Sequence, residues 1–99
     1  MYDEDDFEIE TLFIDVDGDY GIVVDMSKNG TPKLGELKCI CFTDDTLSTP
    51  YNGKSEIYVG YVVCEYVAKI IPPTEIDMMV KSKIKWLLKK YKKEIEECQ

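Results

Sequence analysis

The alternation of apolar and polar residues predicts two neighbouring strands near the start of the chain. The segments "FEIETLFIDV" (7–16) and "YGIVVDM" (20–26) both alternate with the two-residue period of a half-buried strand. Asp17 and Gly18 stand between them. An Asp-Gly pair flanked by such segments is typical of a hairpin with a two-residue turn, because both turn positions need a positive φ. We therefore predict an antiparallel hairpin over residues 7–26.

A two-residue turn would also fix which residues of the hairpin lie opposite each other. Val16 would face Asp19, and Phe13 would face Ile22. One face of the hairpin would then be mostly apolar, while the other would mix carboxylates with aliphatic side chains. This is the pattern of an antiparallel sheet that is covered on one side.

Two more apolar segments predict the rest of the sheet. Residues 36–43, "ELKCICFT", alternate as a third strand, and residues 56–71, "EIYVGYVVCEYVAKII", are rich in β-branched and aromatic residues. Sixteen residues are too many for one straight strand in a small sheet. We expect a bend at Gly60 or a break near Glu65. A short helix over 61–70 also fits the spacing, although the composition favours a strand.

The C-terminal quarter changes to a helical period. A proline pair ends the sheet, and Thr74 followed by Asp77 resembles a helix N-cap with an acid at its third position. We predict one long amphipathic helix over 74–97 that packs on the sheet, with a final turn at 95–99 that frays or meets another chain. Its apolar stripe consists of Ile76, Val80, Ile84, Leu87, Tyr91, Ile95 and Cys98.

These elements predict a single α+β domain over residues 1–99, which begins with an acidic tail at 1–6. A small antiparallel sheet of about four strands, connected as a meander, would be packed by the one C-terminal helix. The chain has 99 residues, 44% of them hydrophobic, which is enough for one modest core.

Charge points to the kind of partner. The net charge is −8, but residues 1–72 hold fifteen acids and five lysines, whereas residues 73–99 hold five acids and seven lysines. Such a body should repel nucleic acid and attract a protein with a basic surface. The carboxylates expected to contact that partner are Asp3, Glu4, Asp5, Asp6, Glu8, Glu10, Asp17, Asp19, Asp44 and Asp45.

The segment "FIDVDGD" (13–19) resembles the first motif of haloacid-dehalogenase-like phosphatases, in which apolar residues precede D-x-D-G. The resemblance implies that Asp15 attacks phosphorus, that Asp17 acts as acid and base, and that Asp44 and Asp45 of "CICFTDD" form the metal-binding pair. That family uses a doubly wound fold of several βαβ units. Here the residues that follow the motif alternate as a returning strand, and a hairpin accounts for them without chemistry.

Other chemical interpretations find little support. Asp15, Asp17 and Asp19 are spaced as in a calcium loop, but Gly18 precedes the third acid and Met26 stands where a glutamate is needed. The chain has no histidine, the commonest general base. The four cysteines lack paired C-x-x-C knuckles and are interpreted as buried thiols rather than zinc ligands: Cys39, Cys41, Cys64 and Cys98. We expect no enzyme activity, no cofactor and no bound metal.

The hypothesis that remains is a small acidic protein-interaction module. Its sharpest form is a phage or mobile-element inhibitor that mimics nucleic-acid charge and blocks a basic host enzyme. The alternative is a self-assembling structural or adaptor subunit, a homodimer for example, that uses a lysine-rich helix surface of Lys85, Trp86, Lys89 and Lys93. The acidic start is unlike a signal peptide and there is no membrane-length apolar segment, so we expect a soluble cytoplasmic protein.

Overall fold

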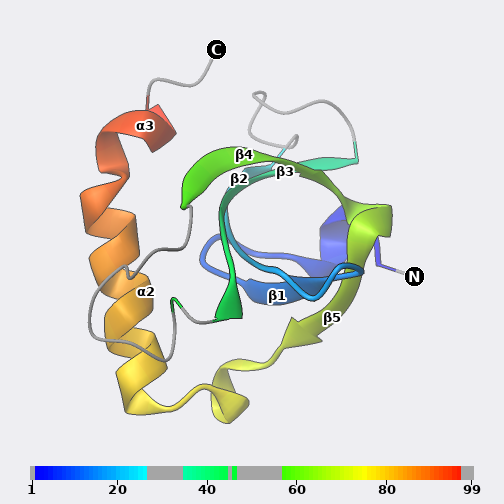
Figure 1. Ribbon diagram of the computed structural model, residues 1–99. Helices are drawn as coiled ribbons and strands as arrows, with labels where there is room; N and C mark the ends of the chain where they lie inside the picture. The colour runs from blue at the N-terminus through cyan, green and yellow to red at the C-terminus, as the bar shows by residue number, and fades with distance from the viewer. Residues whose placement is uncertain (1, 27–34, 45, 47–56, 97–99) are drawn as a thin grey trace.

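A computed structural model describes residues 2–26, 35–44, 46 and 57–96, and shows a curled antiparallel sheet beside a C-terminal helix (Figure 1). The predicted α+β class is confirmed, with five strands in place of about four. The strands are β1 (Leu12–Asp15), β2 (Tyr20–Met26), β3 (Glu36–Phe42), β4 (Tyr58–Val63) and β5 (Val67–Ile71). Their order is β4-β3-β2-β1-β5, so the first four form the predicted meander and β5 returns to pair with β1.

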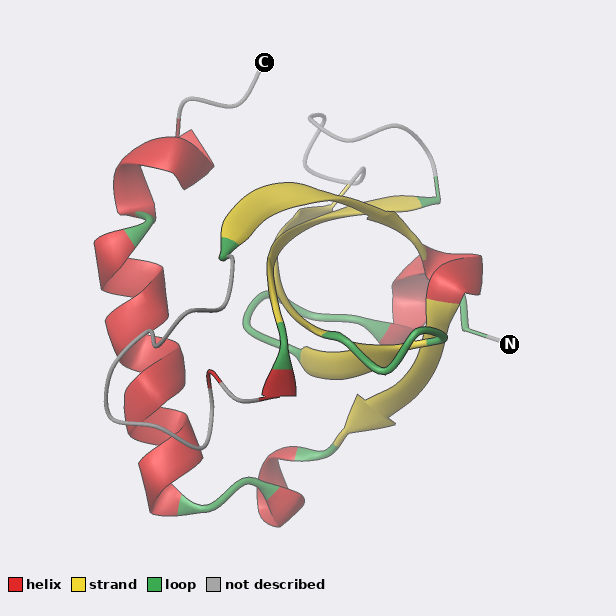
Figure 2. Cartoon of the chain, in the orientation of Figure 1, coloured by secondary structure: helices red, strands yellow, loops and turns green. Residues whose placement is uncertain are grey.

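The fifth strand arises because the long segment 56–71 breaks near Glu65, the second of the two expected positions. A 3-10 turn, η3 (Cys64–Tyr66), separates β4 from β5. Gly60 lies within β4 opposite Cys39, and no helix forms over 61–70 beyond this one turn. The two edge strands of the sheet are therefore joined through η3, and the sheet curls round to bring them together (Figure 2).

Backbone hydrogen bonds hold η3 on both sides. The Cys64 N–H donates to the Gly35 carbonyl at 2.9 Å, and the Val16 N–H donates to the Tyr66 carbonyl at 3.0 Å. The second bond places the tip of the β1–β2 hairpin against η3. Segments about fifty residues apart in the sequence thus meet at the end of the β1–β5 pair.

The predicted hairpin is confirmed, but its register is shifted by one residue. Phe13 lies opposite Gly21 and not opposite Ile22. The shift is required by packing as well as by the turn, because a Cβ on Gly21 would lie 2.3 Å from a ring carbon of Phe13. Only glycine leaves room for this ring across the strand pair.

The turn itself has three residues, 16–18, in place of the predicted two. One carboxylate oxygen of Asp15 accepts hydrogen bonds from the N–H groups of Asp17 (2.8 Å) and Asp19 (3.0 Å). The Asp15 N–H also donates to the Asp19 carbonyl at 2.8 Å, which closes the loop. Gly18 has φ 87° and takes the left-handed position that such three-residue loops require. The side chain of Asp15 therefore overrides the Asp-Gly preference for a shorter turn.

The first strand is shorter than predicted, since β1 begins at Leu12 and not at residue 7. Residues 4–6 form a 3-10 turn, η1 (Glu4–Asp6), and a second turn follows in which Glu10 has φ 75°. The Glu8 N–H donates to the Thr11 hydroxyl at 2.9 Å. These local side-chain bonds compete with strand pairing, and the alternation of apolar residues could not reveal them.

Both faces of the sheet are apolar, which corrects the expectation of one mixed face. The register shift moves Ile22 to the face of Leu12, and Val23 to the face of Phe13. The concave face encloses Phe7, Phe13, Val23, Met26, Leu37, Cys39, Cys41, Cys64 and Val67. The convex face packs against the C-terminal helix through Leu12, Ile22, Ile40, Phe42, Ile84 and Leu87. Figure 1 shows the helix outside the ring of strands.

The helix differs from prediction at its start and in its continuity. It consists of α2 (Met78–Lys90) and α3 (Lys92–Glu96), separated at Tyr91. Thr74 belongs to a separate 3-10 turn, η4 (Pro73–Glu75), and Asp77 is the N-cap, accepting from the Val80 N–H at 2.8 Å.

The apolar stripe of the helix is confirmed where the structure describes it. Ile84 and Leu87 are buried on the sheet, while Ile76, Val80, Tyr91 and Ile95 are partly buried against the same cluster. Lys38, buried on the convex face, donates from Nζ to the carbonyl of Ile95 and so fixes α3 to the sheet. Cys98 and the predicted helix end at 97 lie outside the described residues.

Candidate functional site

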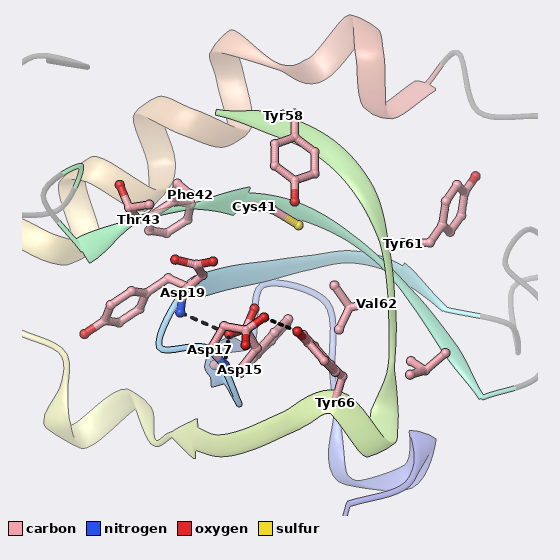
Figure 3. Close-up of a pocket in the computed structure, with 13 residues that line it drawn as sticks. Asp15, Asp17, Asp19, Cys41, Phe42, Thr43, Tyr58, Tyr61, Val62 and Tyr66 are labelled. Atoms are coloured by element: carbon pink, nitrogen blue, oxygen red, sulfur yellow. Dashed lines mark hydrogen bonds between the residues drawn. The ribbon is translucent and has the colours of Figure 1, made fainter. Parts of the chain in front are cut away.

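A hollow of about 550 Å³ opens between the tip of the β1–β2 hairpin and β4, and we call it the acid–tyrosine hollow. Its polar lining comes from Asp15, Asp17, Asp19, Tyr58, Tyr61 and Tyr66. Its apolar lining comes mainly from Phe13, Cys41, Phe42 and Val62. Figure 3 shows the Asp17–Tyr66 pair on one side and the Tyr58 hydroxyl on the opposite side. Four strands, β1 to β4, and η3 thus converge on one acidic and aromatic site.

The three aspartates of the hollow have different roles. Asp15 holds the turn, because one of its oxygens accepts from two backbone N–H groups. Asp17 accepts a hydrogen bond from the hydroxyl of Tyr66. Asp19 is exposed at the mouth of the hollow, and its backbone but not its carboxylate takes part in the turn bonds.

The tyrosines are exposed although they line a hollow. Tyr58, Tyr61 and Tyr66 keep 53%, 48% and 40% of their surface exposed, values that are high for aromatic rings. The hydrogen bond to Asp17, followed by desolvation and the negative charges of the three aspartates, raises the pKa of Tyr66 to about 12. Tyr66 therefore keeps its proton at neutral pH and remains a hydrogen-bond donor.

The thiol at the base of the hollow is also protonated at neutral pH. Burial is the main cause that raises the pKa of Cys41 to about 11, and the charges of Asp15 and Asp19 add to it, against a hydrogen bond with Tyr58 that lowers it. Burial also raises the pKa of Cys39 and of Cys64. All three are free thiols in the structure. None is an activated nucleophile at neutral pH.

The geometry of the β1–β2 hairpin tip favours a turn over the metal-binding and phosphatase interpretations. Within the described ranges, no three acidic, cysteine or histidine side chains converge in a way that could hold a metal ion. Asp15 turns towards backbone amides, and the chain reverses into an antiparallel strand instead of entering a helix. The arrangement is that of a structured turn that presents carboxylates outward.

The other predicted partner-binding acids are spread over separate surfaces. Those of η1 cap its turn: Asp3 accepts from the Asp5 N–H, and Asp6 accepts from the Asp3 N–H. Glu4 accepts from the Gly35 N–H at 3.2 Å and borders a second hollow of about 410 Å³ beside η3. Glu8, Glu10 and Asp44 are exposed elsewhere, and Asp45 lies outside the described residues. Among the predicted acids that the structure describes, only Asp17 and Asp19 line the acid–tyrosine hollow.

The predicted assembly surface lies on the outer side of the helix. Lys85, Trp86, Lys89 and Lys93 are all exposed there. The Nζ atoms of Lys83 and Lys90 lie 4.4 and 4.8 Å from the centre of the Trp86 ring, so cation–π contacts within the helix partly cover it.

Sequence reasoning missed the tyrosines of the hollow. In the sequence, Tyr58, Tyr61 and Tyr66 indicate a strand, and Tyr66 also fits the helical spacing of 61–70. Three tyrosines within nine residues, 58–66, are a signal of a binding surface that the sequence does contain. The sequence does not show that the fold brings them beside the acidic hairpin tip at 15–19.

Comparisons with models of known protein families, with curated proteins and with solved structures found no match. In the described part of the chain, no helical segment combines the length and the hydrophobicity needed to cross a membrane.

Proposed function

We propose that this chain is a non-catalytic protein-interaction module whose acid–tyrosine hollow binds a basic segment of another protein. The observation that carries the proposal is the placement of Asp15, Asp17 and Asp19 beside three exposed tyrosine rings in one hollow. Tyrosine is enriched at protein interfaces, where its ring supplies contact area and its hydroxyl a hydrogen bond. The carboxylates and the net charge of −8 favour a cationic partner.

The protonation states in the hollow support a binding role over a catalytic one. A general base for work near neutral pH needs a pKa near 7. Tyr66 and Cys41 have pKa values of about 12 and about 11, so both hold their protons there. The one oxygen of Asp15 that takes part in the turn is already occupied by two N–H donors.

The sharpest form of the proposal is an inhibitor from a phage or mobile element that covers a nucleic-acid groove on a basic host enzyme. Carboxylates at the hairpin tip and on η1 would take the place of phosphates in that groove. Nucleic acid itself would be repelled by the same charges, so the partner is a protein.

The test is a peptide array that contains basic, neutral and acidic sequences of equal length, probed with the labelled protein at 50 and 300 mM NaCl. We expect binding only to basic peptides, and a steep loss of binding at the higher salt concentration, because exposed charge pairs are screened. Equal binding to neutral peptides, or binding to basic peptides that does not respond to salt, would contradict the proposal.

A second candidate is self-assembly through the helix. Met79 and Trp86 lie two turns apart on the outer side of α2 and are 68% and 39% exposed, with lysines on either side. The exposed carboxylates of η1 and of the hairpin tip on a second copy would supply the acidic counterpart of this surface. Light scattering across a hundredfold range of concentration tests it: a mass that stays at 11.4 kDa removes this candidate.

A further inference from the structure

The ligand chemistry of the acid–tyrosine hollow can be narrowed to one functional group. We propose that the hollow takes a single guanidinium group, the side chain of one arginine in the partner's basic segment. This inference rests on the proposed function and makes it more specific. The acceptors would be the carboxylates of Asp17 and Asp19, and the rings of Tyr58 and Tyr66 would flank the cation.

The acceptors suit a donor with several N–H groups. Asp17 uses one oxygen for the Tyr66 hydroxyl, which orients its carboxylate and leaves further lone pairs for a ligand. Asp19, two residues further along the chain and just after the turn, offers a second carboxylate. A guanidinium group carries five N–H donors in a planar fork and can bridge two such acceptors, whereas an ammonium group acts as a compact point charge.

The rings suit a flat, weakly hydrated cation. Tyr58 and Tyr66 approach the hollow from opposite sides (Figure 3). Guanidinium stacks on aromatic faces and is hydrated more weakly than ammonium, so it loses less on entering a site walled by tyrosine and valine. The hollow, about 550 Å³, also has room for the residues on either side of the arginine.

Selectivity for guanidinium over ammonium would also prevent self-binding. The chain has twelve basic residues, all of them lysines, and seven of these lie in residues 73–99. An acidic site that accepted any cation would bind the helix lysines of other copies. A site that prefers guanidinium binds an arginine of a different protein more tightly than a lysine of another copy, because this chain has no arginine.

The experiment uses the full-length protein and three nine-residue peptides in a Gly/Ser/Ala background, with arginine, lysine or citrulline at the centre. Binding is followed by amide chemical shifts in ¹⁵N-labelled protein. We expect the arginine peptide to shift the amides of residues 16–19 and 58–66. The lysine peptide should bind at least about fivefold more weakly, and the uncharged citrulline peptide should not bind.

Two variants with the same change in charge locate the site. Asp19→Asn should weaken arginine-peptide binding about tenfold, because it removes one charged acceptor from the hollow. Asp5→Asn is the matched control: Asp5 is also exposed but lies on η1, outside the hollow, so binding should not change. Both carboxylates are exposed, and thermal melting checks that both variants remain folded. Tyr66→Phe is a further variant that should weaken binding by releasing the Asp17 carboxylate.

The outcomes separate this inference from the broader proposal. Equal affinity for arginine and lysine peptides, or an equal effect of Asp5→Asn and Asp19→Asn, would overturn the guanidinium site, while salt-sensitive binding of basic peptides in the array would still support the interaction module. Shifts confined to η1 or α2 would also overturn it. If the array shows no preference for basic peptides, the broader proposal fails on its own test.

Discussion

The hydroxyl of Tyr66 donates a hydrogen bond to the carboxylate of Asp17, which ties η3 to the tip of the β1–β2 hairpin across 49 residues of sequence. Together with the backbone bond from Val16 to Tyr66, it extends the contact between β1 and β5 into η3. The geometry of the acid–tyrosine hollow therefore depends on contacts between two segments that lie far apart in the sequence.

This contact predicts an alkaline effect on stability. The hydrogen bond to Asp17 is the main cause that raises the pKa of Tyr66 to about 12 from an ordinary value of 10.0. Between these values the folded protein keeps a proton that the unfolded chain has lost, so the stabilisation is complete below pH 10 and disappears as pH rises through 12. Urea unfolding measured from pH 9 to 12 should show this decline.

The control is Asp17→Asn, which removes the charge that raises the pKa. In that variant, ultraviolet titration of tyrosinate should find Tyr66 ionising nearer pH 10, and the part of the alkaline decline due to Tyr66 should be absent. Identical titration curves for the two proteins would show that Tyr66 and Asp17 are not bonded in solution.

The pairing of Phe13 with Gly21 predicts a second, purely steric effect. A methyl group at position 21 would lie 2.3 Å from the Phe13 ring, so Gly21→Ala should destabilise the fold by about 1–3 kcal/mol through overpacking. Chemical denaturation measures the loss. Phe13→Leu should recover part of it in the double variant, since the smaller side chain vacates the space.

Gly18→Ala separates crowding from backbone conformation. Nothing lies within 4 Å of a Cβ at this position, but its φ of 87° is unfavourable for alanine, at about 1–2 kcal/mol. Phe13→Leu should not rescue this variant. A similar rescue at both glycines would mean that Gly21 is required for its conformation and not for the ring beside it.

The hairpin shows how far the sequence pattern could go. Alternation located β1, β2 and the reversal between them, because period-two burial depends only on which residues are apolar. The register depended on which donors the Asp15 carboxylate accepts and on the space above Gly21, and neither is visible in alternation. A one-residue error was enough to move Ile22 to the wrong face, and so to hide the second apolar face on which α2 packs.

The start of the helix offers a direct comparison between sequence and structure. Asp77 accepts from the Val80 N–H at 2.8 Å, so Asp77→Ala should cost about 1 kcal/mol. Thr74, the N-cap predicted from the capping-box pattern, belongs to η4, and Thr74→Ala should change the free energy of unfolding by less than about 0.5 kcal/mol. Urea denaturation of the two variants side by side measures both. A larger loss of stability for Thr74→Ala than for Asp77→Ala would mean that Thr74 is the helix N-cap, as the sequence predicts.

The site was harder to predict than the fold. Asp17 and Asp19 could be selected from sequence because residues 1–72 hold fifteen acids against five lysines, which predicts an acidic binding surface. Tyr58 and Tyr66 could not, since tyrosine is as typical of a strand as of a binding site. Their place in the hollow depends on the break at η3, which sets Tyr66 just before β5 and next to Asp17 at the tip of the neighbouring hairpin.

The buried thiols provide a test of the concave core. Burial raises the pKa of Cys41 to about 11 and raises that of Cys39 well above its ordinary value. In a Cys98→Ser background, iodoacetamide at pH 8 should label neither residue in the native protein, because the thiolate is scarce and the side chains are covered. Labelling of both should become fast in 6 M guanidinium chloride. Since the folded pKa values exceed the unfolded value of 9.0, the thiols favour the folded state below pH 9, and this contribution falls as pH approaches 11. Rapid native labelling of Cys39 at pH 8 would mean that the curled sheet opens readily between β3 and its neighbours, because the Cys39 thiol is fully covered in the closed structure.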